Sequence, residues 1–300
     1  MRSGLPDRVV GTGTCGKAVR FIADDGVRLD GILFRESKAS DTCIVYLHGM
    51  GGSMISGLTM AIAEAIGNKA ALFTFNNRGH DSEASAWKFS GRRRKRVRIG
   101  VNFERFEDSV NDISGAIRCL RRMGFERFVL CGHSTGCQKV TYYQYRKRDR
   151  AVMGLALLAP CDDYNLNRRS LGKKYAKSLA ECRGMMRKRK GDTLLSYARG
   201  MSAQRYDSVI DPKRVEARIF DYEGRLAEFS KVKAPILAVF GTEEEFRLMP
   251  VKKYLDILRV KSRSVSFSAA EIEGAGHSFE GTEADVAEAV SSFASKTLRR

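Results

Sequence analysis

The sequence predicts an α/β protein built around a mostly parallel sheet. Short apolar runs alternate with segments of helical periodicity along most of the 300 residues. Hydrophobic residues make up 43% of the chain, which is enough for one large α/β core with an added subdomain. A third observation is a glycine-flanked serine at 132–136, between an apolar run and a helical segment. Strand ends of this kind are where α/β sheets usually carry their functional groups.

The first half of the chain supplies most of the expected elements. Residues 17–23 and 27–35 are predicted to form two strands joined by a tight turn at 24–26. Further buried strands are expected at 42–47, 70–75, 127–131 and 151–158, with helices at 53–66, 104–123 and 135–147. The basic segment 92–96 (Arg-Arg-Arg-Lys-Arg) is expected to be a loop.

The pattern changes between residues 162 and 230, where apolar runs shorten and charge density rises. We expect this segment to be a helical cap inserted over the strand ends, with residues 1–161 and 231–300 forming the core. Alternation then resumes with strands at 234–240 and 264–272 and helices at 251–259 and 283–298. The whole sheet is expected to have eight strands.

The strongest functional motif is Gly-His-Ser-Thr-Gly at residues 132–136. A G-x-S-x-G motif between a strand and a helix is typical of a nucleophile elbow, in which a strained turn lifts the serine hydroxyl from the sheet edge. The flanking glycines allow the backbone to crowd there. Ser134 is therefore the candidate nucleophile, and the alternative is a serine that only caps the helix.

A serine hydroxyl needs a general base, and the chain contains four histidines. His48 and His80 lie in loops after strands, and His133 is the immediate neighbour of the serine. His277 follows the last expected strand and precedes the last helix, which is the late position of the base in the order Ser, acid, His. Elimination therefore favours His277.

The third group is a carboxylate that orients the imidazole and balances its charge. Three glutamates, Glu243, Glu244 and Glu245, follow the strand at 234–240, and one of them is the candidate. Asp162 or Asp163, after the strand at 151–158, is the rival.

Acyl transfer also needs donors for an oxyanion. The glycine-rich segment 48–53 (His-Gly-Met-Gly-Gly-Ser) follows the strand at 42–47. The backbone N–H groups of Met50 and Thr135 are the expected pair, and the side chain of Met50 is expected to face the acyl pocket.

Together these motifs resemble the α/β-hydrolase superfamily over residues 17–298. The segments that carry the resemblance are 47–53, 77–82, 132–136, 236–245 and 276–277. The resemblance implies a two-step esterase mechanism without a metal or organic cofactor. The family's spacing favours Glu244, although most relatives have aspartate there. Residues 132–138 (Gly-His-Ser-Thr-Gly-Cys-Gln) also resemble a fungal and plant branch that includes siderophore-ester hydrolases.

The formal net charge of +18 is concentrated in two regions, 92–98 and the expected cap. A basic cap could steer anionic ester substrates to the site. Trp87, Phe89, Phe103 and Phe106 lie near the arginines, a pattern known in single-stranded nucleic-acid binding. No RNA-binding motif accompanies them, so a small-molecule ester rather than nucleic acid is the expected partner.

The cysteines and the lack of long apolar segments indicate where in the cell the protein is expected. Seven cysteines without a C-x-x-C pair argue against a disulfide framework and favour buried free thiols in a reducing compartment. The first 17 residues lack the apolar stretch of a secretory signal, and no apolar run is long enough to span a membrane. A soluble, cytoplasmic protein is expected, while its oligomeric state is left open.

Overall fold

The structure is a computed structural model that describes residues 16–35 and 40–298. Cys15 and most of the segment expected to lack a secretory signal lie outside the described residues. Within the described ranges, no helix is both long and apolar enough to cross a bilayer.

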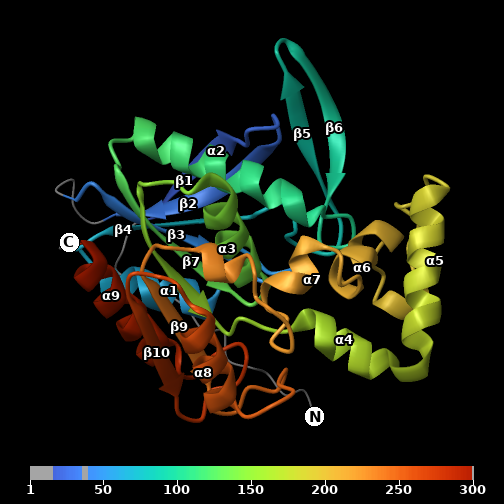
Figure 1. Cartoon of the computed structure of the whole chain (residues 1–300). Coiled ribbons are helices and arrows are strands. Elements are labelled where there is room, and N and C mark those ends of the chain that lie inside the picture. The colour runs from blue at the N-terminus through green and yellow to red at the C-terminus, as the bar shows by residue number, and fades with distance from the viewer. Residues whose placement is uncertain (1–15, 36–39, 299–300) are drawn as a thin grey trace, which may run out of the picture.

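An eight-stranded sheet forms the centre of the molecule (Figure 1). Its strands are β1 (Gly16–Ile22), β2 (Arg28–Phe34), β3 (Thr42–Leu47), β4 (Ala71–Phe75), β7 (Arg127–His133), β8 (Val152–Leu158), β9 (Ile236–Gly241) and β10 (Phe267–Ile272). Their spatial order is β1-β2-β4-β3-β7-β8-β9-β10. Only the pairings of β2 with β1 and β4 are antiparallel, which confirms the predicted mostly parallel sheet.

The central strands are apolar along their whole length because helices cover both faces of the sheet. Every residue of β3 and β4 is buried. The covering helices are α1 (Gly57–Ile66), α2 (Ser109–Arg122), α3 (Thr135–Lys147), α8 (Val251–Lys261) and α9 (Glu283–Leu298). α1 packs on α9, and α2 packs on α3, while α3 also contacts β7 and β8.

Four further helices lie beside this core, at one side of the sheet in Figure 1. They are α4 (Asp163–Leu171), α5 (Tyr175–Arg187), α6 (Ala203–Ile210) and α7 (Val215–Ile219). They fall within the segment 162–230 that was expected to be a cap. A small apolar cluster of their own, which includes Cys182, Tyr206 and Ile210, holds α5 and α6 together.

The loop expected at 92–96 is wrong for residues 93–96, which belong to a strand, while Arg92 lies in the turn before it. β5 (Ala84–Ser90) and β6 (Arg93–Ile99) form a two-stranded antiparallel hairpin that projects from the body of the molecule (Figure 1). β6 has no apolar run from which a strand could be predicted, because five of its seven residues are basic and most are exposed. Pairing with β5, rather than burial, defines this strand.

Candidate active site

The sharp turn between β7 and α3 presents the hydroxyl of Ser134. This residue has φ 54° and ψ −125°, in the left-handed region that non-glycine residues rarely occupy. A Cβ on Gly132 would lie 2.4 Å from the carbonyl oxygen of Gly136, and a Cβ on Gly136 would lie 2.3 Å from that of Leu47. Only glycine fits at either position, so the motif is required by backbone packing around the turn.

His277 lies next to the serine although 143 residues separate them in sequence. Its Nε2 is 2.9 Å from Ser134 Oγ. Its Nδ1 is 2.9 Å from each carboxylate oxygen of Glu244. A carboxylate only accepts, so Nδ1 carries the proton and the lone pair of Nε2 faces the serine hydroxyl. This is the tautomer in which the imidazole can accept the serine proton.

The loop after β9 gives the three adjacent glutamates three different surroundings. The side chain of Glu244 is 1% exposed, and its Oε1 also accepts from the N–H of Phe246 at 3.0 Å. Glu245 Oε2 accepts from the backbone N–H of His277 at 2.7 Å. Glu243 is exposed. Glu244 is thus the glutamate that meets the imidazole, and Glu245 holds the backbone of the same histidine.

The two rival aspartates have other partners. Asp162 caps α4 through Asn165 and accepts from the N–H of Tyr222, and burial raises its pKa to about 6. Asp163 accepts from Gln138 Nε2 at 3.0 Å. Burial, followed by the nearby charge of Glu216, raises the pKa of Asp163 to about 7. Neither carboxylate is hydrogen-bonded to His277.

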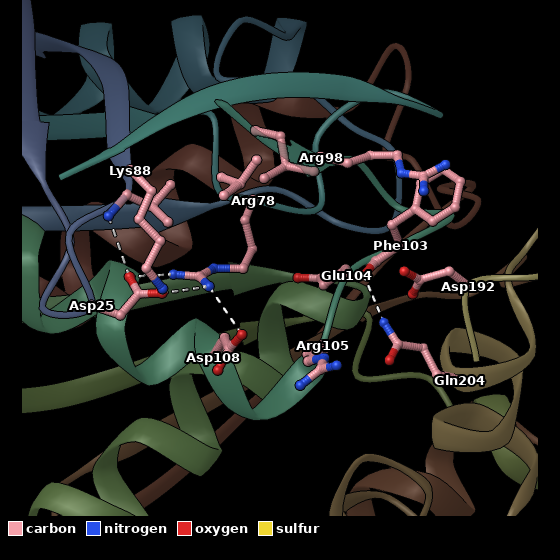
Figure 2. Close-up of a pocket in the computed structure, with 13 residues that line it drawn as sticks. Asp25, Arg78, Lys88, Arg98, Phe103, Glu104, Arg105, Asp108, Asp192 and Gln204 are labelled. Atoms are coloured by element: carbon pink, nitrogen blue, oxygen red, sulfur yellow. Dashed lines mark hydrogen bonds and ion pairs between the residues drawn. The ribbon is translucent and has the colours of Figure 1, made fainter. Parts of the chain in front are cut away.

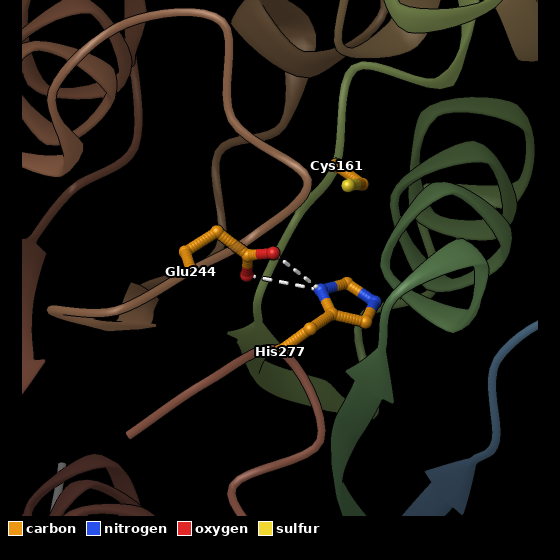
Figure 3. A group of neighbouring side chains, drawn as sticks. All are labelled: Cys161, Glu244 and His277. Atoms are coloured by element: carbon orange, nitrogen blue, oxygen red, sulfur yellow. Dashed lines mark hydrogen bonds and ion pairs between the residues drawn. The ribbon is translucent and has the colours of Figure 1, made fainter. Parts of the chain in front are cut away.

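Cys161 lies close enough to Glu244 and His277 for their ligand atoms to fall within 4.8 Å of one another (Figure 3). This donor set does not fit a metal. The direct bond between Glu244 and His277 Nδ1 uses both of these ligands. Burial raises the pKa of the Cys161 thiol well above its usual value, and the thiol contacts the carbonyl of Phe246 at 3.6 Å. The cysteine is therefore a packed thiol beside the imidazole.

The glycine loop after β3 lies directly against the serine. A Cβ on Gly49 would lie 2.9 Å from Ser134 Cβ. Thr135 is the first residue of α3, so its N–H has no acceptor within the helix. In the described part of the chain, no protein acceptor takes the N–H of Met50 either. Both donors expected for an oxyanion border the same cavity as Ser134.

A buried polar chain runs behind the glycine loop. His48 Nδ1 donates to the carbonyl of Gly49 at 2.8 Å, and His48 Nε2 accepts from the N–H of Asn77 at 3.2 Å. Lys139 Nζ donates to Asn77 Oδ1 at 2.9 Å and pairs with Glu104 at 2.5 Å. Burial, reinforced by the charge of Lys139, lowers the pKa of His48 to about 4, so this ring stays neutral.

The other histidines are also accounted for. His133 Nε2 donates to the backbone carbonyl of His277 at 2.8 Å, and burial lowers its pKa to about 4. His80 pairs with Asp81 at the surface. Of the four rings, only His277 approaches the serine hydroxyl, and His133 helps to hold the loop that carries it.

The segment 77–82, which carries part of the family resemblance, has a structural role through Arg78. The guanidinium of Arg78 pairs with three carboxylates, those of Asp25, Asp108 and Asp112. Figure 2 shows the pairs with Asp25 and Asp108. These contacts tie the β1–β2 turn to the start of α2. Arg78, Asp25 and Asp108 line a second cavity of about 300 Å³ beside the hairpin, which shares no residue with the cavity around Ser134.

The cavity around Ser134 has a volume of about 520 Å³. Met50 and Phe246 form part of its wall, and the ring of Phe246 stands edge-on to His277, with centroids 4.8 Å apart. Arg199, an exposed residue between α5 and α6, also lines it. The site is thus bordered by the core on one side and by the expected cap on the other.

Sequence reasoning missed the residues that support the site from a distance. The pairing of Lys139 with Glu104 joins residues on separate elements, and no local pattern signals it. The contact of His133 with the carbonyl of His277 is equally non-local. The one available signal was Lys139 itself, a charged residue in the buried part of α3, since a buried charge needs a partner.

The architecture and the elbow define an α/β-hydrolase fold. The chain belongs to the family described as "Protein of unknown function (DUF1749)", which matches residues 98–295. No curated protein sequence matches the chain.

Several solved structures share this fold at low sequence identity. Est1E from Butyrivibrio proteoclasticus with bound ferulic acid is 18% identical, with a TM-score of 0.63 over 94% of this chain and 100% of that one. Carboxylesterase CesB from Bacillus subtilis is 17% identical, with a TM-score of 0.57 over 93% and 92%. The Pyrococcus furiosus esterase Pf2001 is 15% identical, with a TM-score of 0.59 over 98% and 96%. The resemblance to a fungal and plant branch stays a prediction.

Proposed function

We propose that this protein is a serine hydrolase that cleaves a carboxylic ester through an acyl-enzyme on Ser134. The observation that carries the proposal is the hydrogen-bonded series Ser134–His277–Glu244, with both bonds at 2.9 Å. The esterases that share the fold favour an ester over other acyl bonds. The resident groups need no metal or organic cofactor for this reaction.

In the first step, Ser134 Oγ bonds to the ester carbonyl carbon while its proton passes to His277 Nε2. Glu244 stabilises the imidazolium that results. The N–H groups of Met50 and Thr135 donate to the oxyanion. The carbon–oxygen bond to the alcohol then breaks, and His277 returns the proton to the leaving oxygen.

In the second step, water takes the place of the alcohol. His277 removes a proton from this water, whose oxygen attacks the acyl carbon of the ester on Ser134. The second tetrahedral intermediate collapses to the carboxylic acid, and His277 gives the proton back to Ser134 Oγ. We propose that residues 162–230 act as the cap that closes over the substrate, with Arg199 available to an anionic group.

Hydrolysis of p-nitrophenyl acetate tests this function. We expect Ser134→Ala to lose at least about 10³-fold in kcat, because the residual rate then comes from binding and oxyanion donors alone. Ser268→Ala, an exposed serine on β10, is the matched control and should retain full activity. Equal activity of Ser134→Ala and the native protein would overturn the proposal. The corresponding thioester and anilide show whether the ester is preferred.

A further inference from the structure

The hairpin β5–β6 is the most strongly charged element of the molecule, and the proposed hydrolysis does not use it. Residues 84–99 contain seven basic residues and no acidic residue. β5 packs against the β1–β2 turn close to the tip of the hairpin, where the N–H of Phe89 donates to the carbonyl of Gly26 at 2.9 Å and Lys88 pairs with Asp25 at 3.0 Å. The turn at 90–92 and most of β6 are exposed, and the hairpin projects from the body of the molecule (Figure 1).

Of the seven cations of the hairpin, the five at 92–96 have no acidic partner among the described residues. Arg98 lies 3.9 Å from Glu83, near the base. In residues 16–35 and 40–298, no salt bridge reaches any residue of 92–96, and these residues are exposed. Five adjacent cations repel one another at the surface, and a ligand that brings negative charge would relieve this repulsion.

The register of the hairpin places aromatic and arginine side chains on one face. Trp87 is opposite Arg96, and Phe89 is opposite Arg94. Directly paired residues, and residues two apart on one strand, share a face of the sheet. Both guanidinium groups lie over the ring of Trp87, with centroid distances of 4.8 Å for Arg94 and 5.2 Å for Arg96. The sequence did not reveal this arrangement because 92–96 looked like a loop.

We propose that the hairpin β5–β6 binds single-stranded nucleic acid. Arginine and lysine would contact the phosphates, while bases stack on the aromatic face around Trp87. Such binding tolerates many sequences, so it requires no separate RNA-binding motif.

Two features favour a nucleic-acid strand over an anionic bilayer. The tip of the hairpin consists of Ser90, Gly91 and Arg92, with no apolar residue to insert among lipid chains. The opposite face is also basic, since it carries Arg93 and Lys95, which are opposite Ser90 and Lys88 in the register. A flexible strand can reach cations on both faces, whereas a planar surface meets only one.

Trp87 is the only tryptophan of the chain, so its emission reports directly on this surface. We would titrate the full-length protein with a 20-nucleotide oligouridylate at several salt concentrations. Stacking is expected to quench the emission. If the five cations at 92–96 each contact a phosphate, the slope of log K against log salt should be about −3.5. A duplex of equal length, whose bases are already stacked, should quench less.

Charge variants distinguish binding at the hairpin from attraction to the overall positive charge of the protein. We expect Arg94→Gln/Arg96→Gln to weaken binding about tenfold or more at 0.1 M salt. The matched control Arg187→Gln/Arg189→Gln removes the same charge from exposed residues at the end of α5 and just after it. This control should bind within about twofold of the native protein if the contact is local. Circular dichroism verifies that each variant is folded.

The aromatic contribution is measured with a labelled oligonucleotide by fluorescence anisotropy. Trp87→Ala should weaken binding about five- to hundredfold, and Trp87→Phe should restore most of it. Equal effects of the two charge variants, or full affinity of Trp87→Ala, would overturn the proposal. It would also be overturned if vesicles of 30% phosphatidylserine shift the Trp87 emission to the blue while the oligonucleotide leaves it unchanged.

Discussion

At the scale of single residues, the loop after β9 shows how strongly position in a turn controls chemistry. Three identical side chains follow one another, yet only Glu244 is buried against Nδ1 of His277. Glu245 reaches the backbone of the same histidine, and Glu243 points to solvent. From sequence alone, the three could be ranked only through the spacing found in similar proteins, because side-chain direction depends on the turn.

The glutamate series gives the first prediction. Glu244→Gln should lower kcat about 10³- to 10⁴-fold, because the neutral amide no longer stabilises the imidazolium or enforces the Nδ1–H tautomer. Glu243→Gln is the control and should leave kcat unchanged, since this side chain is exposed. Ester hydrolysis at saturating substrate measures both. A larger loss from Glu243→Gln than from Glu244→Gln would contradict the assignment.

Asp163 gives a prediction about stability and pH. Burial raises its pKa to about 7, so between about pH 4 and pH 7 the folded protein binds more protons at this site than the unfolded chain does. Its contribution to folding therefore becomes less favourable as pH rises through this range. Asp163→Asn should be more stable than the native protein at pH 8, and the difference should shrink toward zero near pH 4.

Urea denaturation across this pH range measures the difference for Asp163→Asn. Subtracting the native curve removes the contributions of His48 and His133, which titrate in both proteins. A stability difference that does not change between pH 4 and pH 8 would show that Asp163 is not perturbed.

At the scale of elements, the elbow is held from both sides. α3 begins at the strained Ser134, and Lys139 on the same helix reaches Asn77 and Glu104 behind the glycine loop. A helix, a loop and a strand end are thereby fixed relative to one another. The strands and helices of this core can be predicted from the spacing of apolar residues. The ion pair between Lys139 and Glu104 cannot, since it joins residues 35 positions apart.

Breaking that pair should be costly. Lys139→Met leaves Glu104 buried without its cation, which should destabilise the fold by about 3–5 kcal/mol. Lys139→Met/Glu104→Gln removes both charges and should recover part of this loss. Urea denaturation measures the two variants, and equal stability of the single and double variants would contradict the role of the pair.

At the scale of the whole molecule, sequence patterns predicted the number and order of the core elements well. Buried strands such as β3 and β8 carry unbroken apolar runs, and their alternation with helices defines a parallel sheet. The strand β6 of the hairpin was missed because it is stabilised by pairing with β5 and most of its residues are exposed. The geometry of the candidate site required tertiary contacts that no local pattern encodes.

The reactivity of the buried thiols measures whether this core unfolds as one unit. Cys43, Cys131 and Cys137 lie on β3, β7 and α3 and are fully buried, which raises the pKa of each thiol. Their labelling by iodoacetamide should therefore require global unfolding. The urea midpoint for labelling, read by peptide mass spectrometry, should coincide with the midpoint from circular dichroism. Labelling well below that midpoint would show that the sheet opens locally.

The central claim is that His277 activates Ser134 for covalent catalysis. Peptide mass spectrometry after reaction with a fluorophosphonate tests it most directly. We predict a single adduct, on Ser134, that is absent in Ser134→Ala and forms far more slowly in His277→Ala. An adduct on another residue, or an unchanged labelling rate in His277→Ala, would contradict the account.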